Sequence, residues 1–478
     1  MIAGFLYNGD ESQRLADFAA KIEQATTGEI TIIDDEQLSK HEGRYIFLDD
    51  TNPDFSEYEI KVENGNVILY ANYYSLDACI NSFFSDMLGY DLSQGKVIGG
   101  INLTQGKVYA VEKTSVYTKE KLMSVLEEIY NDDSRLIIGQ QMNQTVPIGE
   151  VFDKEIEAFR EGCGVEPALL GWDCVGTMIY PQNQQNLESA RVKIAYQLTE
   201  YARSGGVVTL SPHYPNPLDE NPVPGNSIKG ELGHEDKWEE LFDQDSGIYK
   251  RFMDYLEQLG DFLEILDKNG VPIIFRNLFE MNGDWTWYCI GQTNENGVEK
   301  KIDSQYIKDL YILIYDYLVN TRGLDNLIWL YSPNVMIEGG KEDMGDVLDC
   351  YPGDEYVDII GVDWYPKTKD DLESPQKLLN NYERLVNKTG KLFVFGELSA
   401  GDALCTGEPG FTATDYANML KTFAEKGIRS AYTLAWSSHD SSAGRVKRAI
   451  YEMGNGKEFY LENPGFLDKE ATKKLLYS

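Results

Sequence analysis

The sequence of 478 residues predicts a (β/α)₈ TIM barrel preceded by a small α/β domain. Two observations predict the barrel. Beyond residue 136, eight short apolar runs alternate with long amphipathic segments, and each run ends in polar or aromatic residues. Such alternation is typical of parallel strands with crossover helices, and in a TIM barrel the strand ends converge on the face that carries the active site. An open doubly wound sheet is disfavoured because no Gly-x-Gly-x-x-Gly follows any run.

Residues 1–92 are predicted to form the small α/β domain. Asn64-Gly65, between two alternating runs, predicts a β-hairpin of Tyr58–Val62 and Val67–Tyr70. The spacing of apolar residues in Ser75–Leu88 then predicts an amphipathic helix. Further elements are expected earlier in the segment: strands at Ile2–Tyr7, Glu29–Ile33 and Arg44–Leu48, and a helix at Ser12–Gln24. No residue of this domain suggests chemistry, so we expect it to serve packing or spacing.

Residues 93–136 are predicted to connect this domain to the barrel, which takes residues 137–478. Val97–Val111 contains strand-like pieces around Gly106. Thr118–Asn131 is predicted to be a helix, because Thr118 can cap its N-terminus and Glu120 lies in its first turn, where a negative charge is favourable.

The eight apolar runs are assigned to the barrel strands in chain order: Leu136–Gln141, Ala168–Asp173, Val207–His213, Val271–Arg276, Leu327–Ser332, Val357–Asp363, Leu392–Glu397 and Ala431–Trp436. The segments between most of them predict helices that cover the barrel: Asn186–Ser204, Gly247–Asn269, Ser304–Thr321, Ser374–Lys388 and Thr412–Lys426. Because the strand ends meet at one face, polar residues far apart in the sequence are expected to face a single cleft.

Composition narrows the classes of function. Lys and Arg number 43 against 79 Asp and Glu, and the formal net charge of −36 disfavours nucleic acid and anionic membranes and favours a neutral substrate. No apolar stretch of the sequence approaches the ~20 residues of a membrane span. The six Cys show no Cys-x-x-Cys spacing and there are only four His, so we expect neither a metal nor a cofactor. The chain opens without a basic segment or a long apolar one, so we expect a cytoplasmic protein, or a secreted one if a leader peptide was removed.

Glu280 follows the fourth apolar run, in a stretch that is rich in polar and aromatic residues. Arg276, Asn282 and Trp285 all lie close to it in the sequence. A carboxyl group among aromatic rings is shielded from water, and its pKa is raised toward that of a useful acid. Aromatic faces also stack on pyranose rings, while polar groups bind hydroxyls. The pattern therefore predicts a carbohydrate site in which Glu280 is the general acid.

A second carboxylate, Glu397, ends the seventh run directly after Gly396. Hydrolysis of a glycosidic bond needs two carboxyl groups that flank the scissile bond. The fourth and seventh strands lie on opposite sides of a barrel mouth, so one carboxyl group can reach each face of the anomeric carbon. Donors such as Arg276 or the hydroxyl of Tyr365 are expected to keep Glu397 ionised.

The order of the motifs resembles glycoside hydrolase family 26, in clan A, over about residues 137–450. The most specific motif is Glu280-Met-Asn-Gly-Asp-Trp285, which continues from Arg276-Asn-Leu-Phe. Other stretches support it by their order and spacing: Gly139–Gln141, Ala168–Asp173, Gly206–His213 with Asn216-Pro217, Tyr331–Asn334, Gly361–Tyr365, Gly396-Glu397 and Trp436.

The resemblance implies a retaining mechanism in which Glu280 is the acid/base and Glu397 is the nucleophile. It also implies the residues that surround the sugar at the cleavage site: His213, Asp363, Tyr365, Trp285 and Trp436. Arg276 and Asn282, which flank Glu280 in its motif, complete the predicted set of substrate-binding residues.

The sequence departs from the usual pattern of the family's mannanases. Phe279 stands where they usually have His before the acid/base, Pro212 stands where they have Trp, and Trp287-Tyr288 replaces a more Trp-rich run. The leading prediction is an endo-β-1,4-mannanase whose partner is a polysaccharide or oligosaccharide substrate. Other members of the family cleave β-1,3-xylan or mixed-linkage β-glucan, so these substrates stay open, as does a carbohydrate-binding barrel without catalysis. An NAD- or phosphate-dependent barrel enzyme is disfavoured by the missing Gly-rich loop.

Overall fold

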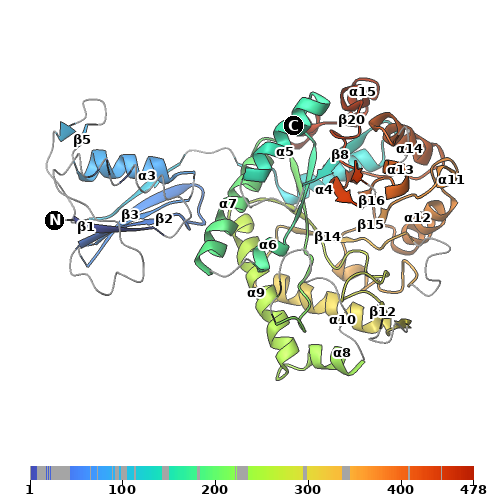
Figure 1. Ribbon diagram of the computed structural model, residues 1–478, viewed down its shortest axis with the longest axis horizontal. Helices are drawn as coiled ribbons and strands as arrows, with labels where there is room; N and C mark the ends of the chain where they lie inside the picture. The colour runs from blue at the N-terminus through green and yellow to red at the C-terminus, as the bar shows by residue number, and fades with distance from the viewer. Residues whose placement is uncertain are drawn as a thin grey trace. The chain divides into compact units, whose positions relative to one another are not determined.

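The computed structural model describes residues 2–7, 18, 20, 22, 44–64, 66–72, 74–88, 90–91, 96–97, 105–111, 115–142, 150–179, 184–220, 222, 235–293, 299–335, 345–406, 410–442 and 444–478. The chain divides into two compact units (Figure 1). The first comprises Met1–Ser115 and Tyr180–Tyr196, and the second comprises Val116–Ile179 and Gln197–Ser478.

The first unit is built on a sheet with the strand order β1-β2-β4-β3-β7. These strands are β1 (Ile2–Tyr7), β2 (Arg44–Asp49), β3 (Glu57–Glu63), β4 (Asn66–Tyr70) and β7 (Lys107–Ala110). The predicted hairpin is confirmed, since β3 and β4 pair antiparallel and Asn64 adopts the left-handed φ of 50° that such a turn requires. Strand β7 comes from the predicted connector and lies at the edge of this sheet. The division of the chain at residues 92 and 136 stays a prediction.

A helical segment covers one face of this sheet (Figure 1). It consists of α3 (Leu76–Ser82) and the π-helical η1 (Phe83–Met87), which together confirm the predicted helix. Its buried side chains pack against the inward-facing residues of β3 and β4 in one hydrophobic core, among them Ile60, Leu69 and Phe84. A short antiparallel pair, β5 (Tyr90–Asp91) and β6 (Lys96–Val97), follows. The predicted strand Glu29–Ile33 lies outside the described residues, and so does most of the predicted helix Ser12–Gln24.

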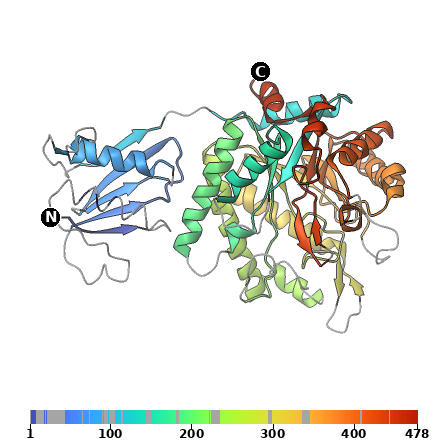
Figure 2. The same ribbon diagram turned by 45° about the horizontal axis from the view of Figure 1, so that its top comes forward.

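Among the described residues of the second unit, eight parallel strands close into a barrel (Figure 2). The order is β8-β9-β10-β11-β14-β15-β16-β17, and β17 pairs with β8 to complete the ring. The strands are β8 (Leu136–Gln141), β9 (Leu169–Asp173), β10 (Val207–Ser211), β11 (Ile273–Arg276), β14 (Leu327–Tyr331), β15 (Ile359–Trp364), β16 (Phe393–Leu398) and β17 (Tyr432–Ala435). The predicted fold is confirmed, and each of the eight apolar runs supplies one strand.

Helices lie outside these strands and cover them (Figures 1 and 2). The long ones are α4 (Lys119–Tyr130), α5 (Glu150–Cys163), α9 (Gly247–Lys268), α10 (Ser304–Tyr315) with η2 (Asp316–Thr321), α12 (Gln376–Thr389) and α14 (Ala413–Glu425). Helix α7 (Gln184–Arg203) begins in the first unit and enters the second at Gln197. Local sequence explains where several begin. Thr118 accepts a hydrogen bond from the Lys121 N–H at 3.2 Å, as predicted for this cap, and Thr412 forms a capping box with Asp415.

Shorter elements complete the second unit. They are the helices α6 (Val175–Met178), α8 (Glu235–Phe242), α11 (Lys369–Glu373), α13 (Asp402–Thr406), α15 (Gly456–Leu461) and α16 (Lys469–Leu476), the turn η3 (Asp354–Tyr356), the hairpins β12–β13 (Gly291–Thr293, Glu299–Lys301) and β18–β19 (His439–Ser441, Gly444–Val446), and the strand β20 (Phe466–Leu467), which pairs with β8. Within the described part of the chain, no helix combines the length and the apolar character that crossing a bilayer requires.

Candidate active site

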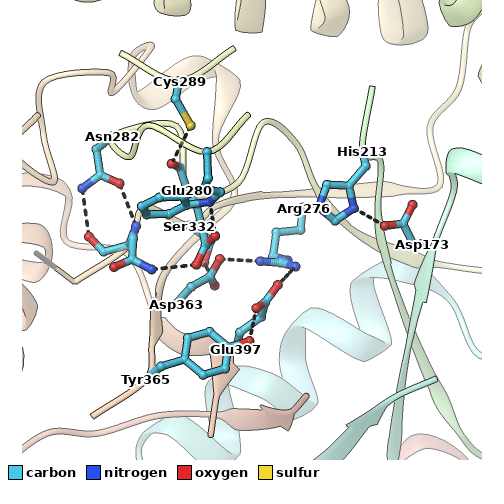
Figure 3. A network of polar contacts seen from close by, with 12 residues as sticks. Asp173, His213, Arg276, Glu280, Asn282, Cys289, Ser332, Asp363, Tyr365 and Glu397 are labelled. Carbon is cyan, nitrogen blue, oxygen red and sulfur yellow. Dashed lines mark hydrogen bonds and ion pairs between the residues drawn. The ribbon is translucent and has the colours of Figure 1, made fainter. Parts of the chain in front are cut away.

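The predicted site residues meet at the carboxyl ends of the barrel strands (Figure 3). Arg276 ends β11, Asp363 lies near the end of β15, and Glu397 lies near the end of β16. All three side chains are buried. They come from strands that long helical segments separate in the sequence. The barrel therefore brings together charged groups that a single hydrophobic core would exclude.

The backbone after β11 takes an uncommon course. Leu278 and Glu280 have left-handed φ values of 44° and 55°, which residues other than glycine rarely adopt. Hydrogen bonds hold this turn: the Glu280 N–H donates to the Ser332 carbonyl at 2.8 Å, and the Gly283 N–H donates to the Glu280 carbonyl at 2.9 Å. Backbone strain of this kind persists only where the surroundings impose it, and it is concentrated at functional sites.

The Glu280 carboxyl group accepts hydrogen bonds from two neutral donors. Asn334 Nδ2 donates to Oε1 and Trp285 Nε1 donates to Oε2, each at 2.6 Å. Burial and the nearby charge of Glu397 raise the pKa of Glu280 to about 7, although both donors and Arg276 oppose the rise. Near neutral pH this group can therefore both give and take a proton.

The Glu397 carboxylate has charged and hydroxyl partners instead. Arg276 donates to Oε1 and the Tyr365 hydroxyl donates to Oε2. The side chain is 3% exposed, so both oxygens are held in fixed directions inside the site.

Arg276 links the two buried acids at the site's centre. Its guanidinium donates to Asp363 and to Glu397 (Figure 3). It also lies over the Phe279 ring, 3.9 Å from the ring centroid. The other Asp363 oxygen accepts a hydrogen bond from Ser332 Oγ at 2.6 Å. Burial lowers the pKa of Arg276, but Asp363 and Glu397 outweigh this effect and raise it. The arginine is therefore a permanent cation at this position.

Three carboxyl groups face one another across the mouth. One oxygen each from Glu280, Asp363 and Glu397 lies within 4.8 Å of the others. Double displacement at a sugar requires a pair about 5–5.5 Å apart, whereas inversion requires about 6.5–9.5 Å to admit a water molecule. Such a cluster could hold a cation, but Arg276 already supplies a positive charge to two of its members.

The other predicted residues differ in how far they are exposed. Trp285 is 42% exposed and Trp436 is half-buried, so both keep ring surface for a ligand. His213 bonds Asp173 through Nδ1 and meets the Phe279 ring edge-on at 4.5 Å. Asn282 is fully buried, and its amide group bonds the backbone of Asn334 and Gly345. Asn282 therefore holds the backbone of Asn334, whose side chain donates to Glu280.

Several contributors were not in the predicted set. Asn334 and Ser332 follow the fifth strand, and their polar side chains at a strand end were the available signal. Asp173, at the end of the second strand, gave the same signal. Arg448 lies over the Tyr365 ring, 4.4 Å from the ring centroid, and nothing in its sequence context marks it.

A cavity of about 370 Å³ lies elsewhere in the second unit. Its lining includes Leu136, Phe395, Ile428 and Phe466, which are near the amino ends of their strands or just before them. It shares no lining residue with the cluster around Glu280 and Glu397.

Two facing carboxyl groups at the mouth of a closed (β/α)₈ barrel are the arrangement that a glycoside hydrolase requires. Residues 111–450 match the model of glycosyl hydrolase family 26. The match spans most of the chain, and the chain belongs to this family. The predicted resemblance is thereby confirmed.

The chain is also similar to proteins whose activity is named. The mannan endo-1,4-β-mannosidase of Bacillus subtilis (strain 168) is 32% identical over 289 residues, which are 60% of this chain and 71% of that protein. Mannan endo-1,4-β-mannosidase A and B of Caldalkalibacillus mannanilyticus is 30% identical over 313 residues, which are 65% of this chain but 54% of that protein. Among solved structures, the YdhT protein from Bacillus subtilis has a TM-score of 0.56 at 26% identity, with 74% of this chain and 94% of that chain covered.

Proposed function

We propose that this glycoside hydrolase is a retaining endo-β-1,4-mannanase in which Glu280 is the acid/base and Glu397 the nucleophile. The observation that carries the proposal is the short separation between two carboxyl groups with opposite surroundings. Burial and the nearby charge of Glu397 raise the pKa of Glu280, whereas Glu397 accepts hydrogen bonds from the Arg276 guanidinium and the Tyr365 hydroxyl.

The first half of the reaction uses this difference. Glu280 gives its proton to the glycosidic oxygen as that bond breaks, and a carboxylate oxygen of Glu397 forms a bond to the anomeric carbon. In the second half, Glu280 takes a proton from water, and the resulting hydroxide oxygen displaces Glu397 from the sugar. A pKa of about 7 for Glu280 suits both directions of proton transfer.

The remaining predicted residues divide into two proposed roles. The exposed ring surface of Trp285, together with Trp436 and His213, is available to contact sugar units. Asp363 is fully buried with both oxygens bonded, so it acts through Arg276 by fixing the guanidinium that holds the nucleophile. Asn282 acts through Asn334 in the same indirect way.

Mannan is favoured as the substrate because the curated relatives are named for it. Phe279 supports a second candidate, another β-linked glycan, since family mannanases usually carry His at this position. The Phe279 ring is only 2% exposed and lies between Arg276 and His213. Its effect on a bound sugar would therefore pass through these two neighbours.

Product analysis on mannan, β-1,3-xylan and mixed-linkage β-glucan, side by side, tests the proposal. We expect release of mannan oligosaccharides of several lengths, as internal cleavage requires, with the β-anomer formed first in a proton NMR time course. Preference for another glycan would replace the substrate but keep the mechanism. First appearance of the α-anomer would exclude retention, and failure to release sugar from any of the three would support a binding protein.

A further inference from the structure

Arg448 lies behind the tyrosine that bonds Glu397. Its guanidinium carbon is 4.4 Å from the centroid of the Tyr365 ring, its Nε donates to the Ala400 carbonyl at 3.1 Å, and its Nη2 donates to Asp402. The side chain is 13% exposed. Arg448 is therefore held on three sides, and one of these is the face of an aromatic ring in the site.

The partners of Arg448 belong to the two segments that carry the nucleophile and its hydroxyl donor. Ala400 and Asp402 follow β16, the strand of Glu397, and Tyr365 follows β15. These segments also bond each other, because the Gly401 N–H donates to the Pro366 carbonyl at 2.8 Å. Arg448 spans both, so its position fixes the Tyr365 ring relative to the Glu397 strand.

We propose that Arg448 is a positioning residue for the nucleophile, acting through the Tyr365 hydroxyl that bonds Glu397 Oε2; this inference rests on the function proposed above. A cation over a phenol ring is attracted to its face and restricts the ring's motion. It also makes the hydroxyl a stronger donor. Burial and the charge of Glu397 raise the pKa of Tyr365 well above its usual value, and the charge of Arg448 opposes that rise.

A double-mutant cycle on the full chain tests this route. The variants are Arg448→Met, Tyr365→Phe and both together, assayed on the polysaccharide that the wild type cleaves fastest. We expect Arg448→Met to lower kcat about 5- to 10-fold with KM changed less than about twofold, which is the size of one buried cation–π contact. Tyr365→Phe is expected to cost about 10- to 100-fold, as loss of a hydrogen bond to a charged group does. Once the hydroxyl is absent, adding Arg448→Met should cost less than about twofold.

Two further variants separate positioning from folding. Arg448→Lys keeps the charge but loses the planar guanidinium, so it should recover part of the lost kcat. Arg445→Met is the matched control, because Arg445 lies in the same segment but bonds Glu452 outside the site, and its kcat should equal that of the wild type. Thermal unfolding of each variant checks that the chain folds. If Arg448→Met fails to fold, the cycle is run with Arg448→Lys.

An equal cost of the Arg448 substitution with and without the Tyr365 hydroxyl would overturn the inference, since it would mean that Arg448 only holds its own loop. Unchanged kcat in Arg448→Met would overturn it as well. Every variant in the cycle keeps Glu280 and Glu397, so failure here leaves the proposed function intact. Failure of the proposed function would appear separately, as normal turnover without Glu397.

Discussion

The loop after β11 and the end of β16 each hold a glutamate at the barrel mouth, but by different means. Glu280 lies on a left-handed turn outside the strand, and neutral amide and indole groups donate to it. Glu397 lies within a strand, and a buried guanidinium and a phenol donate to it. The same side chain thus has different surroundings at the two positions, and at Glu280 burial and the charge of Glu397 raise the pKa against the effect of its two donors.

The backbone near Glu397 shows why its partners can approach so closely. Gly396 precedes it, and a Cβ atom at that position would overlap Ser332 Oγ and Asp363 Oδ1. The missing side chain leaves room for the Asp363–Arg276 pair next to the nucleophile. On the other side, the turn at Glu280 depends on the Ser332 carbonyl, so the fifth strand supports both glutamates.

Removing each glutamate in turn is expected to give the largest effect. Glu280→Ala and Glu397→Ala should each lower kcat by about 10⁴-fold or more, because one of the two bond-making groups is lost. Added azide distinguishes the two roles. In Glu280→Ala it should attack the glycosyl-enzyme and give a β-glycosyl azide, whereas in Glu397→Ala it should replace the nucleophile and give an α-glycosyl azide. Product configuration is measured by proton NMR.

Glu452→Ala serves as the control for these two variants, because Glu452 bonds Arg445 away from the site. It should keep wild-type kcat. Exchange of the two azide products between the variants would mean that the roles of Glu280 and Glu397 are reversed, and wild-type turnover in either variant would end the assignment.

The sequence was sufficient for the fold and for the centre of the site. Eight apolar runs of strand length supplied eight strands, and the polar residues at their ends identified Glu280, Arg276, Tyr365 and Glu397 as neighbours. The fold could be predicted from the sequence because hydrophobic periodicity and strand length are local properties of the chain.

Arg276 and Tyr365 were expected as donors to Glu397, and both bonds are present, whereas the donors of Glu280 were not assigned from the sequence. Asn334 reaches Glu280 across 54 positions, and Arg448 reaches Tyr365 from another strand-end segment. These contacts depend on the direction of single side chains, which spacing alone does not give. The predicted substrate-binding role of Asn282 stays a prediction, and spacing did not reveal that its buried amide group bonds the backbone of Asn334.

The second prediction concerns pH and sharpens the difference between the two glutamates. The pKa of Glu280 is raised to about 7, and the acid must carry its proton in the first step, so kcat/KM should fall as pH rises through about 7. Trp285→Phe removes a hydrogen bond that favours the ionised form of Glu280. The pKa should then rise, and the falling limb should move to higher pH by about 0.5–1 unit. A limb that stays in place or moves to lower pH would show that the indole N–H does not set the protonation of Glu280.

The smallest effect is expected from Ser332→Ala. This variant tests whether the hydrogen bonds around Asp363 and Glu397 influence Glu280. Ser332 Oγ donates to Asp363 at 2.6 Å, while its carbonyl accepts from the Glu280 N–H at 2.8 Å. Alanine removes the first bond and keeps the second. The free energy of unfolding, from urea denaturation, should therefore fall by about 1 kcal/mol, while the falling limb of kcat/KM stays at its wild-type pH. If that limb shifts as far as it does in Trp285→Phe, the hydrogen bonds around Asp363 also govern the protonation of Glu280, and the surroundings of the two glutamates are not independent.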